Sequence, residues 1–208
     1  MTQNLEESAN EQLKRLVEKF DAKEYIRQQE AYPLALGKFV QKFSEVEGFI
    51  QLMVRTLAGI NNEVGIAVFS GVRPDAARDI IGRILTARKM PESSYLKRGF
   101  DRFGVITRAR NDILHYGAKY DMLEAEWNVS NEGYALPGKE RKLLVGPEIL
   151  DSMREDLLIV LACFQYYIFD LGNMENEHLE MFKTLADRKW HYNPPQQSVA
   201  FKKRKTRS

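Results

Sequence analysis

The sequence predicts an all-α protein: a bundle of helices with a small β-hairpin or meander inserted before the penultimate helix. Over most of the chain, apolar residues recur every three or four positions, the spacing of one face of an α-helix. Pro33, Pro74 and Pro147 each precede such a segment, as is typical of a proline in the first turn of a helix. After Tyr120 the pattern changes to alternating apolar and polar residues, which indicates strands.

The N-terminal part of the chain predicts two helices. The first covers residues 4–30 and has one apolar face, formed by Leu13, Leu16, Val17 and Phe20. Pro33 starts the second helix, which runs to about Gly59. Glu47 lies at the edge of its apolar stripe, about 60° from the centre of that stripe. The stripe itself consists of Leu36, Phe39, Phe43, Val46, Ile50, Val54 and Leu57.

Residues 60–72 leave two structures open. The pair Asn61-Asn62 is expected to end the second helix, and residues 64–69 fit either a short strand or an apolar loop packed on the core. A third helix then runs from Pro74 to about Lys89. A fourth helix covers residues 95–119, with Ser93 or Ser94 as its N-cap.

Residues 121–146 predict the β insert. Apolar and polar side chains alternate from Leu123 to Val129, and a turn follows at residues 131–133. Two further short strands are expected over residues 134–136 and 142–145. The pattern leaves open whether this insert covers the fourth helix, reaches a partner or is simply solvated.

Two more helices, from Pro147 to about Gly172 and over residues 173–189, complete the expected bundle. The length of 208 residues suggests a single domain, which we place at residues 1–192. Residues 193–208 are expected to form a disordered basic tail, because five of the last seven residues are positively charged. Without those seven residues the net charge of +2 becomes −3, so composition alone does not indicate a nucleic-acid-binding protein.

The chain is expected to be cytoplasmic and to need no cofactor. Its N-terminus is polar and acidic, unlike a secretory signal, and its longest apolar run, residues 157–169, is too short to span a membrane. The single cysteine, Cys163, excludes an intrachain disulfide and is expected to be buried. No cysteine or histidine cluster has the spacing of metal ligands.

The fourth predicted helix carries the candidate site. Arg110 falls near the middle of its apolar arc, whereas His115 lies on the flank, beside Arg108 and Asn111. A buried arginine is unfavourable unless it is paired. The helix therefore carries either a structural ion pair, with Glu47 as the expected acid, or a functional site.

The residues Arg110-Asn111-Asp112-Ile113-Leu114-His115 resemble the R-x4-H motif of HEPN domains. Members of that family are all-helical bundles, often dimeric and often metal-independent RNases, and they serve in toxin–antitoxin modules, antiviral defence or RNA processing. The resemblance implies such a bundle here. One subfamily has a tyrosine two residues after the histidine, where this chain has Gly117. Control by modification of that tyrosine is therefore not expected.

Metal-independent RNA cleavage needs a base, an acid and a positive charge on the phosphate. Arg110 is expected to stabilise the phosphate and His115 to transfer protons, while Asn111, Asp112 and Glu47 support them. The resemblance implies that a homodimer brings two such motifs together. Phosphate groups of the RNA are expected to contact four further residues: Arg108, Lys202, Lys203 and Arg204.

Two functions remain open at this point. The first is a metal-independent endoribonuclease that acts on RNA as a homodimer, and a toxin of this kind would need an antitoxin or another restraining protein. The second is a non-catalytic scaffold or RNA-binding module in which the motif only builds a dimer interface. The acidic charge of residues 1–201 favours the second.

Overall fold

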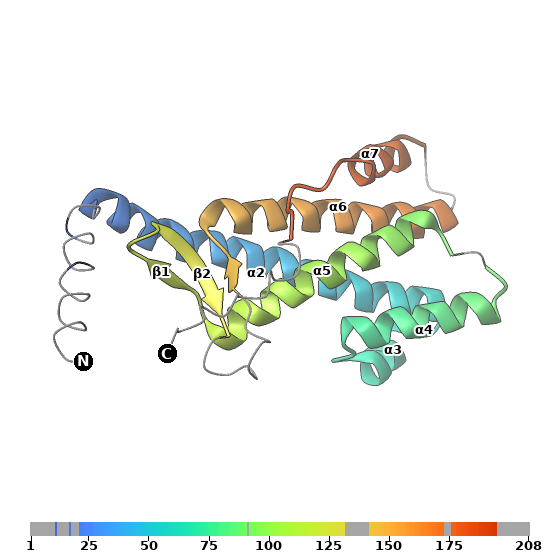
Figure 1. The fold of residues 1–208 in the computed structure, drawn as a ribbon. Coiled ribbons are helices and arrows are strands. Elements are labelled where there is room, and N and C mark those ends of the chain that lie inside the picture. The colour runs from blue at the N-terminus through green and yellow to red at the C-terminus, as the bar shows by residue number, and fades with distance from the viewer. Residues whose placement is uncertain are drawn as a thin grey trace, which may run out of the picture. The chain divides into compact units, whose positions relative to one another are not determined.

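The computed structural model describes residues 11, 17, 21–90, 92–131, 142–172 and 176–194 (Figure 1). These residues form six helices and one three-stranded antiparallel sheet. The strands lie in the sequence immediately before the last two helices. The predicted all-α fold with a small β insert before the penultimate helix is therefore confirmed.

The described residues group into two compact units. The first unit holds residues 11, 17, 21–36, 109–131 and 142–150. The second unit holds residues 37–90, 92–108, 151–172 and 176–194. Three long helices contribute a part to each unit: α2 (Ala22–Ala58), α5 (Ser94–Tyr116) and α6 (Pro147–Leu171). A single domain over residues 1–192 stays a prediction.

Helix α2 runs through Pro33 without a break, so the predicted helix boundary at this proline is wrong. Proline removes one backbone hydrogen bond from a helix. The buried stripe nevertheless continues across it, with Tyr32, Ala35 and Phe39 all buried. Burial of these side chains outweighs the local preference of proline for a helix start. Of the first predicted helix, residues 4–30, the last nine residues belong to α2, and residues 4–20 lie outside the described residues apart from residues 11 and 17.

Residues 60–72 contain a short helix, α3 (Asn62–Phe69), instead of the expected strand or loop. Helix α2 ends at Ala58, directly before Gly59, which has a φ of 66°. Asn61 instead caps the N-terminus of α3, because its side-chain oxygen accepts a hydrogen bond from the backbone N–H of Glu63 at 2.7 Å. The asparagine that was expected to end α2 therefore begins α3.

The next two helices agree with the sequence prediction. Helix α4 (Pro74–Ala87) begins at its proline, and α5 begins beside Ser93, whose hydroxyl oxygen accepts from the N–H of Tyr95 at 3.2 Å. Helix α5 ends at Tyr116, three residues earlier than predicted, because Gly117 adopts a φ of 69°. That left-handed conformation favours glycine and stops the helix directly after the candidate site.

The sheet of the first unit has the strand order β1-β2-β3, with β1 (Lys119–Asp121), β2 (Glu126–Ser130) and β3 (Lys142–Leu144). The predicted third strand is confirmed by β3. Residues 123–125 were expected in a strand, but they lie in the turn between β1 and β2, where Ala125 has a φ of 53°. The expected strand over residues 134–136 lies outside the described residues.

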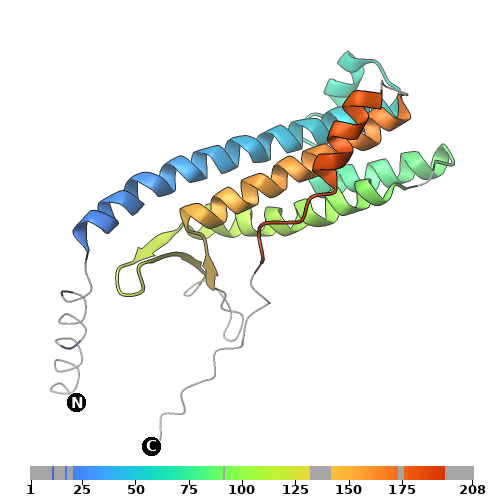
Figure 2. The ribbon, with the colours of Figure 1, turned by 90° about the horizontal axis from the view of Figure 1, so that it is seen from above.

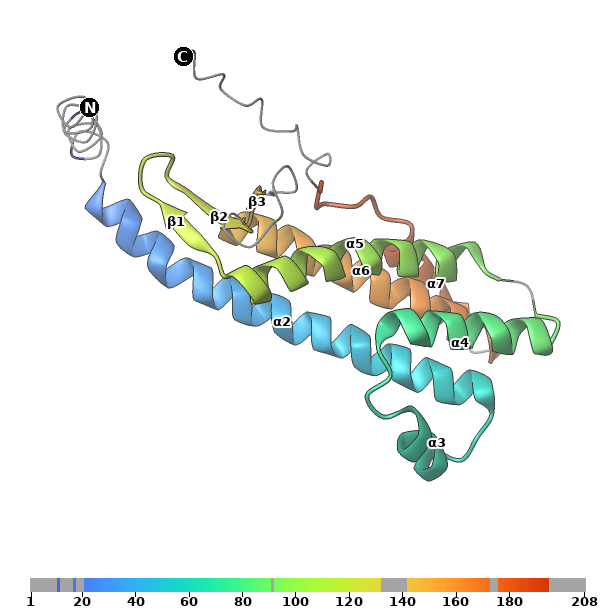
Figure 3. The same ribbon diagram turned by 60° about the horizontal axis from the view of Figure 1, so that its bottom comes forward.

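An aromatic cluster fastens this sheet to the first half of α2, and Figure 3 shows β1 and β2 beside that half. Trp127 on β2 stacks on Tyr32 of α2, with ring centroids 4.1 Å apart. The ring of Tyr120 on β1 packs edge-to-face with two other rings. Its centroid lies 5.5 Å from that of Trp127 and 5.6 Å from that of Tyr25 on α2. Burial raises the pKa of Tyr32 to about 12, so its ring stabilises the cluster with the hydroxyl protonated.

The second unit is a bundle formed by parts of α2, α5 and α6 with α4 and α7 (Asn176–Ala186) (Figure 2). Stacked and tilted aromatic pairs join its helices: Phe43 lies 4.9 Å from Phe103, and Phe100 lies 4.8 Å from Phe164. The last helix is shorter than the predicted segment, residues 173–189. The residues after it do not continue the helix but lie against α5 and α6.

A buried ion pair connects α5 and α6 in this bundle. Asp156 is fully buried, and Arg102 is 8% exposed. The Nε and Nη2 groups of Arg102 both donate to Oδ2 of Asp156, the first at 2.7 Å. The carboxylate also accepts from the backbone N–H groups of His191 at 2.6 Å and Tyr192 at 3.2 Å. One carboxylate therefore holds two helices and the segment that follows α7.

We predict that Arg102→Ala lowers the free energy of unfolding by about 3–5 kcal/mol, because it leaves the Asp156 carboxylate buried without its cation. The matched control is Arg78→Ala. It breaks an exposed ion pair with Asp101, which also joins two helices, and it is expected to cost about 0.2–1 kcal/mol. Urea denaturation of both variants measures the difference. Equal losses in the two variants would contradict the structural importance of the buried pair.

The single cysteine gives a second test of the bundle. Cys163 is fully buried among Ile159, Ala162 and Ala186, as the sequence predicted for its burial. Burial raises the pKa of its thiol from 9.0 to about 11. Between these values the unfolded chain ionises its thiol while the folded chain keeps it protonated.

We therefore predict that the free energy of unfolding falls as the pH rises from 9 to 11, with a contribution of roughly 2–3 kcal/mol from Cys163. The native thiol should also react with iodoacetamide far more slowly than the thiol of the urea-unfolded chain. Cys163→Ala, compared over the same pH range, should show a smaller fall. Rapid alkylation of the folded protein would contradict the burial.

Candidate functional site

The last two turns of α5 position the motif residues, all of which belong to the first unit. Ile113 is buried and anchors this end of the helix. Arg110 is half-buried, which places it at the border of the buried arc and not at its centre as expected. Leu114, which follows the buried Ile113, is 50% exposed. His115 is exposed in the last turn, as predicted for the flank of the helix.

Arg110 and Asn111 interact directly. The Nη1 group of Arg110 donates to the side-chain oxygen of Asn111 at 3.1 Å. The bond restricts the guanidinium, and it turns the amide so that its NH₂ group is left to donate elsewhere. Asn111 also precedes His115 by one helical turn, so both side chains lie on the same face.

His115 has an aromatic neighbour. Its ring centroid lies 6.5 Å from that of Tyr116, in an edge-on arrangement at 60°. Asp112, three residues before the histidine, is half-buried. The last turns of α5 thus carry a guanidinium, an amide, a carboxylate and an accessible imidazole within six consecutive residues. These groups can bind an anion and transfer a proton near neutral pH.

The other predicted site residues are distributed differently. Glu47 is half-buried and belongs to the second unit, so its pairing with Arg110 stays a prediction. Lys202, Lys203 and Arg204 lie outside the described residues. Among the residues that the structure describes, no group of histidine, cysteine and acidic side chains could hold a metal ion.

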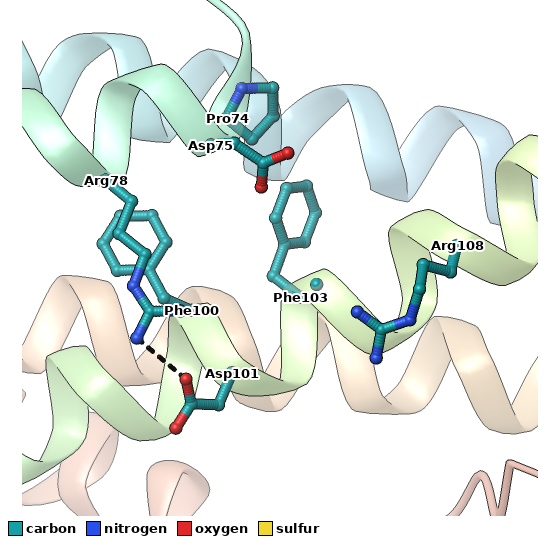
Figure 4. Close-up of a pocket in the computed structure, with 8 residues that line it drawn as sticks. Pro74, Asp75, Arg78, Phe100, Asp101, Phe103 and Arg108 are labelled. Atoms are coloured by element: carbon teal, nitrogen blue, oxygen red, sulfur yellow. Dashed lines mark hydrogen bonds and ion pairs between the residues drawn. The ribbon is translucent and has the colours of Figure 1, made fainter.

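Arg108 belongs to the second unit, where it lines a pocket of about 290 Å³ between α4 and α5. Figure 4 shows its guanidinium on one side of this hollow, with an ion pair of Arg78 and Asp101 at 2.8 Å on the other. Asp75 points into the hollow from the first turn of α4. The pocket therefore offers charges of both signs, and it does not form a purely cationic phosphate site.

One cluster of functional groups was missed from the sequence. The ring Nδ1 atom of His191 lies 3.3 Å from Oδ1 of Asp156, next to the Arg102 pair. No motif in the sequence around His191 singles it out. The sequence did contain one signal for this cluster, because Asp156 directly precedes the longest apolar run of the chain. An acid buried beside such a run requires polar partners.

No family model, curated protein or solved structure matches this chain. The resemblance to HEPN domains therefore rests on the residues of the motif alone. Within the part of the chain that the structure describes, no helix combines the length and the apolar character needed to cross a membrane.

Proposed function

We propose that this protein is a metal-independent endoribonuclease of the HEPN type that acts as a homodimer. The observation that carries the proposal is the contact between Arg110 and Asn111, which lies one helical turn before the exposed His115. A restrained guanidinium and an accessible imidazole are the two kinds of group that phosphodiester cleavage requires.

In the proposed reaction, the 2′-hydroxyl of the RNA attacks the adjacent phosphorus, and the bond from phosphorus to the 5′-oxygen breaks. One His115 takes the proton of the 2′-hydroxyl, and an acid gives a proton to the leaving 5′-oxygen. Arg110 binds the phosphate oxygens, on which negative charge increases. Asn111 orients that guanidinium and can donate through its NH₂ group to the substrate.

A single motif supplies one imidazole, whereas this reaction needs a base and an acid at the same phosphate. A second copy of the chain supplies the second His115, together with a second Arg110. The proposed site is therefore complete only in a dimer. A role as toxin or defence effector in the cytoplasm would in addition require a restraining partner protein.

A non-catalytic interaction module is the second candidate function. The exposed apolar side chains of α3 favour it, since Val64, Ile66 and Val68 are about half exposed or more, at 54%, 47% and 60%. In that case the motif would help to build an interface, and its histidine would not transfer protons.

We predict that the purified protein cleaves RNA in the presence of EDTA and that Arg110→Ala and His115→Ala each lower the rate at least 10²-fold, the usual effect of losing a proton-transfer group or phosphate cation. The matched controls are Arg83→Ala and His178→Ala, which change exposed residues of the same types outside the motif. Circular dichroism and light scattering verify that folding and oligomeric state are unchanged.

Cleavage that survives both motif substitutions would place the activity elsewhere or in a contaminant. A folded dimer that cleaves none of a mixed set of RNA substrates would favour the interaction module. Activity of a strictly monomeric protein would contradict the two-chain site while leaving the roles of Arg110 and His115 in place.

A further inference from the structure

The segment after α7 presents a row of basic side chains. Arg188 and Lys189 are exposed, and the side chain of His191 is 50% exposed. We call residues 188–191 the basic segment. It is neither helix nor strand, yet its course is fixed by contacts with α5 and α6 in the second unit.

Two arginines of α5 contact the basic segment. Arg98 donates through Nη2 to the carbonyl oxygen of Arg188, and its guanidinium lies 4.7 Å from the centre of the Trp190 ring. Arg102 lies 5.1 Å from the same ring. Trp190 also packs on the apolar cluster around Cys163. The segment is therefore pre-organised, with its indole fixed and its flanking cations directed to solvent.

The acidic groups near the basic segment are already engaged. Asp187 accepts from the hydroxyl of Tyr95 at 2.8 Å and pairs with Lys183 at 3.2 Å, and these contacts lower the pKa of its carboxyl group. Asp156 is buried against Arg102. Within the described part of the chain, neither Arg188 nor Lys189 forms an ion pair. Their charges are therefore available to an anionic partner.

Asp156 also orients the imidazole of His191. Because Nδ1 faces the carboxylate at 3.3 Å, the other ring nitrogen, Nε2, points away from it. The imidazole thus presents Nε2 in a fixed direction beside the two cations. Such a group adds a directional hydrogen bond to the non-directional attraction of Lys189.

We propose that the basic segment, held by Arg98 and Asp156, binds the phosphate backbone of single-stranded RNA. Cations that follow a backbone are typical of surfaces for single strands. Trp190, whose ring lies against the guanidinium groups of Arg98 and Arg102, holds these cations in place. A duplex groove is instead entered by a helix or a two-stranded ribbon, and the basic segment is neither. The choice of RNA among polyanions rests on the proposed nuclease function; the location of the surface does not.

The test uses the full-length chain with His115→Ala, which prevents cleavage, and a fluorescently labelled oligouridylate, which has little structure of its own. Arg188→Ala with Lys189→Ala should weaken binding at least tenfold at low salt. It should also make the salt dependence shallower by about 1.4 in the logarithmic slope, since two phosphate contacts are lost. The matched control, Arg83→Ala with Lys142→Ala, removes two exposed charges elsewhere and should leave both quantities close to their original values.

A second measurement places the RNA on the surface. The chain has two tryptophans, so in a Trp127→Phe background the emission reports on Trp190 alone. Oligouridylate should change this emission, and high salt should reverse the change. The proposal would be overturned if the control and the test variants weaken binding equally or if neither changes it. It would also be overturned if the emission of Trp190 does not change when oligouridylate is added.

Two comparisons separate this proposal from the nuclease. If polyglutamate competes as well as RNA of equal charge, the surface binds acidic polymers in general, and the RNA proposal is wrong. If wild type fails to cleave while the basic segment still binds RNA, the nuclease is wrong and the surface stands. If wild type cleaves RNA but substitution of Arg188 and Lys189 does not change RNA binding, the proposed binding surface is wrong and the proposed nuclease function stands.

Discussion

The buried carboxylate of Asp156 constrains much of the second unit. A charge in an apolar core is tolerated only when every lone pair finds a partner. Arg102 comes from a different helix, 54 residues away in the sequence, and the N–H groups of His191 and Tyr192 come from the chain after α7. Satisfying one carboxylate therefore brings three distant segments together. It also fixes a segment that carries exposed cations, although nothing local in its sequence favours a regular structure.

Local signals predicted those elements whose ends depend on local chemistry. Pro74 and Pro147 begin helices because an N-terminal proline loses no internal hydrogen bond, and Gly117 ends α5 because its φ is positive. At Pro33 the same rule gave a wrong boundary. There the adjacent Tyr32 stacks on Trp127, a residue distant in the sequence, and packing of this kind outweighs the preference of the proline.

The candidate site was likewise predictable only where it depends on local structure. Helical periodicity placed His115 on an accessible flank, which depends only on the helix itself, whereas it placed Arg110 at the middle of the apolar arc, where the half-buried side chain does not lie. The hydrogen bond from Arg110 to Asn111 was not predictable, because the choice of side-chain rotamer depends on the surroundings. Likewise, the pattern of alternation indicated that Trp127 is buried but not which ring it meets.

The distribution of charge connects the two proposals. Residues 1–201 carry a net charge of −3, so their overall field does not favour RNA. RNA binding by these residues would depend on places where acids are neutralised internally and cations are not. The basic segment is such a place, because Asp187 and Asp156 are each paired within the protein. A local surface of this kind would complement the proposed catalytic pair, Arg110 and His115, which includes only one arginine per chain. In the two proposals together, substrate affinity and bond cleavage are supplied by different residues.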